Sequence, residues 1–180
     1  MSEGEILGKM RMRRIDEGQR SFLSGSHSLK GGNMPKMPTM VASIMTKNPK
    51  SVGQSVSVVS VAKTMKTAKI GALFVKKGKQ FVGIVTDTDI ARRAASSGKN
   101  LDKLTVDKIM TSPIYTIDST QNVDDAQDMM GDLGIRHLGV TRGGEIVGVV
   151  SVRDLLMHYK RYAQSRINEM EYEEPKIGQD

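Results

Sequence analysis

The chain has 180 residues, a formal net charge of +7 at pH 7, and neither cysteine nor tryptophan. Its length allows one domain or two small ones. The lack of cysteine excludes disulfides, thiolate metal sites and cysteine nucleophiles. No apolar run approaches the ~20 residues that cross a bilayer, and no signal peptide is recognisable at the N-terminus, so we expect a soluble, cytoplasmic protein with no membrane contact.

Residues 1–39 mix Gly, Ser, Lys, Arg and Met with little periodicity and predict a basic, flexible N-terminal tail. Ser2 and Glu5 stand at the spacing of a capping box, so a short helix over residues 3–14 is the alternative.

Residues 40–100 predict one αβ unit. It opens on Ile44-Met45-Thr46, followed by Pro49. Ser55 is a candidate N-cap for a helix whose apolar residues recur at helical spacing. Two strands rich in β-branched residues, Gly71–Val75 and Phe81–Thr86, flank a Lys-rich hairpin loop, and a second helix follows Thr86.

Residues 101–160 repeat this unit. The opening returns as Ile109-Met110-Thr111 and Pro113, and the helix and strands follow at matching distances. A duplication on this scale predicts an internal repeat. The expected fold is therefore α/β (α+β), with two β-α-β-β-α units packed as one pseudo-twofold module. Residues 161–180 predict a C-terminal helix extension and tail, because a helix reading from Asp154 to Glu174 carries an apolar stripe. The stripe comprises Leu156, Tyr159, Ala163, Ile167 and Met170.

A second duplicated motif has the form Gly-hydrophobic-hydrophobic-Thr/Ser-x-x-Asp. It runs from Gly83 to Asp89 and again from Gly148 to Asp154. Both motifs, over about residues 41–160, resemble the CBS domain family, which is named after cystathionine beta-synthase. The resemblance implies a stand-alone Bateman module that dimerises and binds AMP, ADP, ATP, S-adenosylmethionine or a related adenine ligand. No cofactor or metal is required.

The chemistry of the second motif suits a nucleotide. The hydroxyls of Thr86 and Ser151 can donate to a phosphate oxygen, and the carboxylates of Asp89 and Asp154 can accept from ribose hydroxyls. The glycines allow close approach of a backbone or a ligand. The alternative is that each Thr/Ser-x-x-Asp is only a helix capping box.

Arg136 and His137 stand at the start of a strand in the second repeat, where basic residues of nucleotide-binding CBS pairs often face phosphate. Arginine can bind phosphate bidentately. The alternative is a strand with one solvent-facing Arg and a satisfied His. The resemblance implies backbone and apolar walls for adenine, with the core as the alternative for the isoleucines. The corresponding residues are Lys50, Val52, Ile114, Thr116, Ile70 and Ile135.

Charge is divided unequally between the repeats. Residues 41–100 carry 11 basic and 2 acidic side chains, and residues 101–160 carry 6 and 9. Lys63, Lys66 and Lys69 follow one helix of repeat 1, whereas Asp124, Asp125, Asp128 and Asp132 lie on the equivalent helix of repeat 2. The complementarity predicts a head-to-tail homodimer, repeat 1 of one chain against repeat 2 of the other.

Three further functions compete with that of a ligand sensor. Nucleic-acid binding would use the basic first repeat and the segment Lys9–Arg20, although exposed aromatics for base stacking are few. An enzyme is not expected, because three histidines show no metal-ligand spacing and no nucleophile–base or nucleotide-loop motif occurs. A CBS pair without ligand would only dimerise. The sequence does not identify the effector that such a module would regulate.

Overall fold

The computed structural model describes the backbone of residues 39–172 and the side chains of residues 39–168. The predicted tail over residues 1–39, Thr39 apart, and the alternative helix over 3–14 lie outside the described residues, as does the end of the chain after Tyr172.

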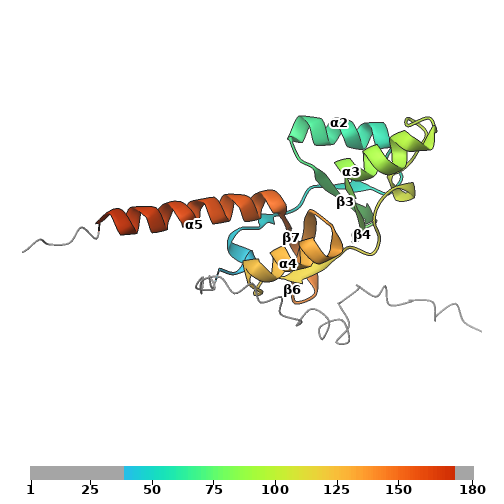
Figure 1. Ribbon diagram of the computed structural model, residues 1–180. Helices are drawn as coiled ribbons and strands as arrows, with labels where there is room; N and C mark the ends of the chain where they lie inside the picture. Colours follow the sequence, from blue (N-terminus) through green and yellow to red (C-terminus); the bar gives the residue numbers. More distant parts are fainter. Residues whose placement is uncertain (1–38, 173–180) are drawn as a thin grey trace, which may run out of the picture.

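Each repeat has the predicted order of strand, helix, strand, strand and helix (Figure 1). Repeat 1 consists of β2 Ser51–Gly53, α2 Val58–Ala68, β3 Ala72–Lys77, β4 Gln80–Thr86, α3 Asp87–Asp89, the π-helical turn η2 Ile90–Ala94 and the 3-10 turn η3 Ala95–Ser97. Repeat 2 consists of β5 Thr116–Asp118, α4 Val123–Leu133, β6 His137–Arg142, β7 Glu145–Ser151 and α5 Val152–Tyr172. The expected fold class is confirmed.

A short leading segment precedes each repeat. The first contains the 3-10 turn η1 Val41–Ser43 and the strand β1 Thr46–Lys47, and the second contains the 3-10 turn η4 Val106–Lys108 and ends at Thr111. These leading segments carry the duplicated Ile-Met-Thr motif.

The two repeats form two sheets with the same pairing pattern. One sheet has the order β2-β3-β4 and the other β1-β7-β6-β5. In each, the first strand of the repeat runs parallel to the second, and the second and third form an antiparallel hairpin. The strand register confirms that the two repeats correspond residue by residue here, because Leu73 pairs with Val85 and the equivalent Leu138 pairs with Val150.

The leading segments are exchanged between the repeats. β1, which precedes repeat 1, pairs with β7 of repeat 2, so that Thr46 lies opposite Val149. In return, Thr111 before repeat 2 bridges to Ile84 in β4, with N–H···O distances of 3.0 and 2.8 Å. Each sheet is therefore extended by the chain that leads into the other repeat.

The helix ends follow local chemistry. The hydroxyl of Ser57 accepts from the N–H of Ser60 at 3.3 Å, so the prediction of Ser55 as N-cap is wrong by two residues. Both first helices end on a left-handed residue, Gly134 in repeat 2 and Lys69 in repeat 1. Glycine adopts this conformation without steric cost, whereas a lysine there is strained.

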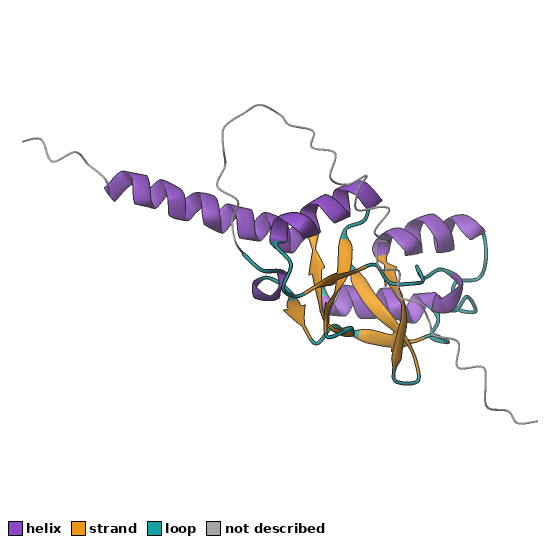
Figure 2. Ribbon diagram, turned by 90° about the horizontal axis from the view of Figure 1, so that it is seen from below, coloured by secondary structure: helices purple, strands orange, loops and turns teal. Residues whose placement is uncertain are grey.

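The core has three parts, and the third joins the repeats. One cluster fills repeat 1 around Val61, Leu73 and Val85, and a second fills repeat 2. The strands of both repeats lie together in the middle of the molecule (Figure 2). A central cluster of Phe74, Ile84 and Ile114 joins them, with Ile146 and Val149 of repeat 2 packed against it. The module is therefore one packed body.

Candidate functional site

Both Thr/Ser-x-x-Asp motifs form complete capping boxes where a strand turns into a helix. Oδ2 of Asp89 accepts from the N–H and the hydroxyl of Thr86, both at 2.9 Å, and Oγ1 of Thr86 accepts from the N–H of Asp89 at 3.3 Å. Ser151 and Asp154 repeat the arrangement at 2.8, 2.6 and 3.4 Å. The capping alternative is thus present in both repeats, and it occupies only one oxygen of each carboxylate.

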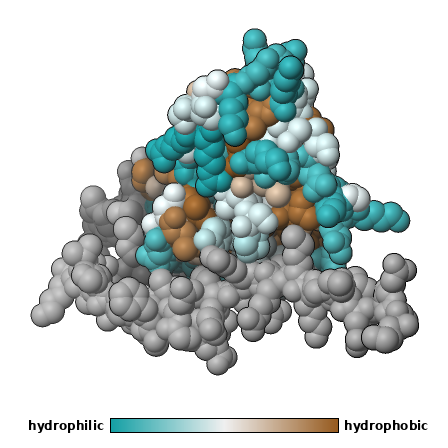
Figure 3. Space-filling view, turned by 90° about the vertical axis from the view of Figure 1, so that its right-hand side faces the viewer, coloured by the Kyte–Doolittle hydropathy of each residue, from teal (hydrophilic) through white to brown (hydrophobic). Residues whose placement is uncertain are grey.

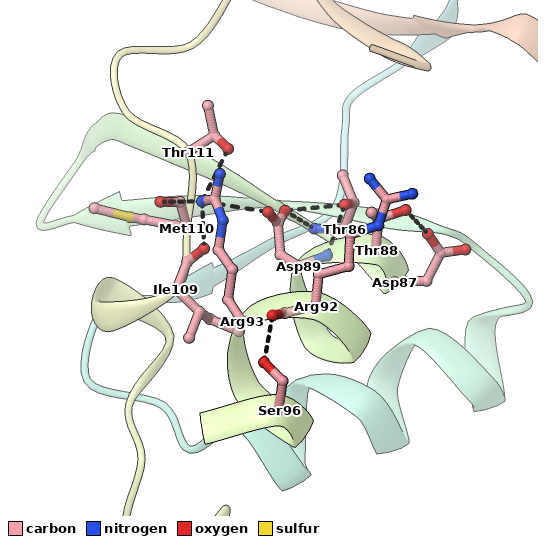
Figure 4. Close-up of polar contacts among 10 residues, drawn as sticks. All are labelled: Thr86, Asp87, Thr88, Asp89, Arg92, Arg93, Ser96, Ile109, Met110 and Thr111. Carbon is pink, nitrogen blue, oxygen red and sulfur yellow. Dashed lines mark hydrogen bonds and ion pairs between the residues drawn. The ribbon is translucent and has the colours of Figure 1, made fainter. Parts of the chain in front are cut away.

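The second oxygen of each carboxylate distinguishes the two repeats. Oδ1 of Asp89 forms an ion pair with Nη1 of Arg93 at 3.3 Å, and Asp89 is only 7% exposed (Figure 4). The residue four positions after Asp154 is His158 instead of an arginine. In the described part of the chain no hydrogen bond or ion pair reaches Oδ1 of Asp154. This oxygen can accept a hydrogen bond from a ligand.

Arg93 also joins the first motif to the leading segment of repeat 2. Its Nη1 donates to the carbonyls of Ile109 at 2.8 Å and Met110 at 3.2 Å, and to the hydroxyl of Thr111 at 3.3 Å (Figure 4). In the sequence, Arg93 contributes only to the basic charge of residues 41–100. Its position four residues after Asp89 on a helix is a recognisable ion-pair spacing.

At the centre, Arg136 of repeat 2 reaches the first motif. Strand β6 begins at His137, so Arg136 lies immediately before the strand, whereas the prediction had the strand begin at Arg136. Its Nη2 lies 2.7 Å from Oδ1 of Asp87 and 2.5 Å from the hydroxyl of Thr88. Both charged side chains are more than half exposed, so the pair contributes little stability. Asp87 and Thr88 were missed, because they lie 49 and 48 residues from Arg136.

His137 lies between the two motifs. A Cβ added to Gly71 would be 3.7 Å from its ring, and its Nδ1 is buried without a hydrogen-bond partner in the described residues. Burial and the charge of Arg136 lower the pKa of His137 below 6.5, while the carboxylates of Asp87 and Asp154 act in the opposite direction. The imidazole is therefore neutral at pH 7 and lies within electrostatic reach of both motifs.

The residues predicted to hold adenine have different surroundings. Ile114 is only 6% exposed and packs in the central cluster, which favours the core alternative. Thr116 lies beside it, against Gly139. Lys50 is exposed, and its carbonyl accepts from the N–H of Phe74. Val52 and Ile70 are partly buried against the repeat 1 core.

Ile135 contributes instead to an apolar groove between α4 and α5. The groove, about 290 Å³ in volume, is lined by Ile135 with Gln127, Met130, Leu155, Leu156 and Tyr159, among others. Neither motif carboxylate nor Arg136 lines it, so it is separate from the polar centre. Within residues 39–168, no three acidic or histidine side chains gather as a metal-ligand set. None of the described helices has the length and apolarity needed to span a bilayer.

Comparison with known proteins identifies the repeat. The family model described as CBS domain matches residues 41–96 and 106–161. An uncharacterized 17.7 kDa protein of Acidianus ambivalens is 36% identical over 121 residues, which cover 66% of this chain and 72% of the relative. Two other curated relatives, from Methanopyrus kandleri and Arabidopsis thaliana, are matched over only 51% and 27% of their own length.

Solved structures share the fold. A protein with CBS domains from Burkholderia ambifaria superposes with a TM-score of 0.65 at 30% identity, covering 67% of this chain and 93% of that one. A hexameric CBS-CP12 protein from bloom-forming cyanobacteria superposes with a TM-score of 0.61 at 30% identity, covering 67% of each chain.

Proposed function

This chain belongs to the CBS domain family, as a tandem pair of CBS domains, and on that premise we propose that it is a non-catalytic regulatory module of the cytoplasm. In this proposal it binds an adenine nucleotide or an adenosyl ligand between its repeats and signals the ligand state to an effector protein. The observation that carries the proposal is the position of Arg136, an exposed guanidinium whose partner is an equally exposed carboxylate on the other repeat. A phosphate or a ligand carboxylate offers a stronger, bidentate partner than Asp87 does.

The two repeats are unequal, and the differences favour repeat 2 as the ligand side. The free oxygen of Asp154 would accept from the ribose hydroxyls, whereas Asp89 is almost buried and engaged by Arg93. Arg136 belongs to the same repeat as Asp154, and its carbonyl accepts from the N–H of Val152 at 3.1 Å, directly after Ser151. A single swing of Arg136 would move its charge from Asp87 to the anionic end of a ligand held by Ser151 and Asp154.

A ligand panel tests the proposal. AMP, ADP, ATP and S-adenosylmethionine, with GMP for comparison, would be screened by thermal shift and followed by isothermal titration calorimetry. A ligand at 100 times its Kd stabilises by about 2.7 kcal/mol, which for a chain of this size is a rise in Tm of roughly 5–10 °C. Asp154→Asn should abolish the rise, whereas the matched Asp89→Asn should retain it. Arg136→Ala should weaken binding, with Arg142→Ala, an exposed arginine of β6, as its control.

A reversed result, with binding lost in Asp89→Asn and kept in Asp154→Asn, would move the site to repeat 1. If no ligand raises Tm, the second candidate holds, that of a CBS pair that only assembles. The two complete capping boxes favour that candidate, because they give Thr86 and Ser151 a sufficient structural role.

Assembly is the third part of the proposal. Self-association is known for the hexameric CBS-CP12 relative. For this chain we retain the head-to-tail homodimer, because Lys63 and Lys66 are exposed on α2 and Asp125 and Asp132 are exposed on α4. Charge-reversed variants, Lys63→Glu with Asp125→Lys, should restore a dimer that either single change weakens. Recovery in no combination would exclude this pairing.

Nucleic-acid binding is the alternative that the basic surface supports. Figure 3 shows hydrophilic side chains gathered over the upper part of the molecule, which repeat 1 forms. Its aromatic residues are not free for base stacking, since Phe74 is buried and Phe81 packs edge-on against it beneath Lys76. Affinity for RNA or DNA that falls steeply with salt would favour this function.

A further inference from the structure

In repeat 1 the side chain of Arg93 fills a set of acceptor groups beside the second motif (Figure 4). Its Nη1 lies 2.8–3.3 Å from Oδ1 of Asp89, the carbonyls of Ile109 and Met110, and the hydroxyl of Thr111. We call these four acceptors the arginine socket. A guanidinium suits the socket, because it is always charged and carries five N–H donors. With Arg93 in place, both oxygens of Asp89 are engaged.

The backbone around this socket is the same in both repeats. Thr46 lies opposite Val149 in β7, just as Thr111 lies opposite the equivalent Ile84 in β4. Within each leading segment, the N–H groups of the isoleucine and the methionine donate to the carbonyl of the first residue of the 3-10 turn, at 2.9–3.1 Å in both segments. The two leading segments therefore have the same local fold and the same place beside the second motif.

Repeat 2 consequently has a socket of its own, with a different side chain in the position of Arg93. Its acceptors are Oδ1 of Asp154, the carbonyls of Ile44 and Met45, and the hydroxyl of Thr46. No side chain in the described part of the chain donates a hydrogen bond to any of these four. The side chain in the position of Arg93 is that of His158, whose Nε2 is buried without a hydrogen-bond partner among the same residues. An imidazole has one N–H donor when neutral and two when charged, too few for a socket of four acceptors.

The occupant of the socket determines how open the motif aspartate is. Residues four apart on a helix are neighbours, so the side chain at this position always lies beside that carboxylate. With an arginine there, Asp89 is only 7% exposed and its Oδ1 is engaged. With a histidine there, Asp154 is partly exposed and its Oδ1 has no partner in the described residues.

We propose that the residue four positions after the motif aspartate decides whether a repeat takes the ligand, and that His158 keeps repeat 2 open by leaving its socket unfilled. His158 is thus a specificity-determining residue that does not touch the ligand, and the module binds one ligand per chain. The ligand part of this inference rests on the proposed function. The socket itself is a property of the fold and is testable without any ligand.

The ligand-free test fills the socket of repeat 2. His158→Arg should raise Tm by about 2–4 °C, because the guanidinium gains charge-assisted hydrogen bonds that the imidazole does not make. Most of this rise should vanish when Asp154→Asn is present as well, since the asparagine removes the charged acceptor. Gln164→Arg, at an exposed position of α5 with no acidic residue three or four positions away, is the matched control and should give no rise. No rise in His158→Arg, or an equal rise with Asp154→Asn, would overturn the proposal.

The ligand test uses ATP and AMP in calorimetric titrations of the full chain. His158→Arg should weaken binding at least tenfold, because the new cation takes the oxygen that the ribose hydroxyls would use. His158→Gln should bind as wild type does, since a neutral amide forms no ion pair with Asp154. Unchanged affinity in His158→Arg would contradict the proposal. So would an equal loss in both variants, because His158 would then contact the ligand itself.

The two tests separate this proposal from the proposed function. If wild type binds neither ATP nor AMP, the proposed function fails, and the Tm of His158→Arg with and without Asp154→Asn alone decides whether the socket exists. Circular dichroism confirms the fold of each variant. If His158→Arg does not fold, His158→Lys brings a cation with a smaller head group to the same place and should raise Tm in the same direction. Failure of both variants to fold would show that this position does not accept a cation, which would also overturn the proposal.

Discussion

Met110 packs directly against Gly83, so closely that a Cβ atom on this glycine would lie 2.5 Å from Sδ of the methionine. The same relationship recurs in the other half, where a Cβ on Gly148 would lie 2.7 Å from Sδ of Met45. The carbonyls of Thr111 and Thr46 stand 3.0 Å from the same two positions. The two duplicated motifs therefore contact each other, and the contact occurs twice. In each case the Ile-Met-Thr of a leading segment packs against the glycine of the second motif in the repeat whose sheet it extends.

Gly83→Ala should destabilise the fold, because the added methyl group overlaps both Met110 and a backbone carbonyl. We expect the free energy of unfolding in urea to fall by about 1–3 kcal/mol. Gly131→Ala is the control, since no heavy atom lies within 4 Å of its added Cβ in helix α4. Alanine there should stabilise by about 0.5–1 kcal/mol. Equal stability of Gly83→Ala and wild type would refute the contact.

Arg93→Ala should loosen the junction between the repeats. The variant leaves the nearly buried Asp89 without its cation and the carbonyls of Ile109 and Met110 without a donor. Because the guanidinium is half exposed, we expect a loss of only about 1 kcal/mol. Arg92→Ala, at the neighbouring exposed position, is the control. Denaturant unfolding measures the difference, and a calorimetric stoichiometry that rises from one ligand to two would show that Arg93 closes the first site.

Tyr159→Phe should remove a hydrogen bond that ties α5 to α4. Its hydroxyl donates to Oδ1 of Asp124 at 2.8 Å. Burial and this carboxylate raise the pKa of Tyr159 well above 10. A raised pKa means that the bond stabilises the fold below pH 10 and is lost as pH rises above it. Wild type should exceed the variant by about 1 kcal/mol at neutral pH, and the difference should shrink in alkali. A constant difference would contradict this assignment.

His137→Gln should reduce the acid sensitivity of the fold. The pKa of His137 is lowered by burial and by Arg136, so the folded state holds the neutral ring. A lowered pKa gives stability that is complete above pH 6.5 and is lost as pH falls below it. The Tm of wild type should therefore fall further than that of the variant between about pH 8 and about pH 5. Parallel falls in both proteins would exclude a role for this imidazole.

Local sequence patterns predicted the helices and strands, but they could not predict the contacts between the two repeats. The duplication, the element order and the helix after Ser151 are all readable from spacing. The N-cap was misplaced because Ser55 and Ser57 both precede the helix, and only the hydrogen bond to Ser60 distinguishes them. Helix α5 starts at Val152, two residues before its predicted start.

Only the local part of the candidate site could be predicted, because its other contacts join residues of different repeats. Thr86 and Asp89 are three residues apart, so their mutual bonding could be expected as a capping box. The meeting of Arg136 with Asp87 depends on how two repeats pack, and neither residue type signals it. Ile114 has the apolar character of a pocket wall, but its position between the two sheets makes it core.

The exchange of leading segments has a consequence for the evolutionary origin of the tandem repeat. A single unit of this kind leaves one strand edge uncovered and offers its own leading strand to a neighbour, which is the geometry of a swapped dimer. The ancestral single unit would have worked only as a pair, and gene duplication would have fixed that pair in one chain. The two halves have since diverged at Arg93 and His158, but each still pairs its leading segment with the sheet of the other repeat. Because of this exchange, neither half is expected to fold when expressed alone.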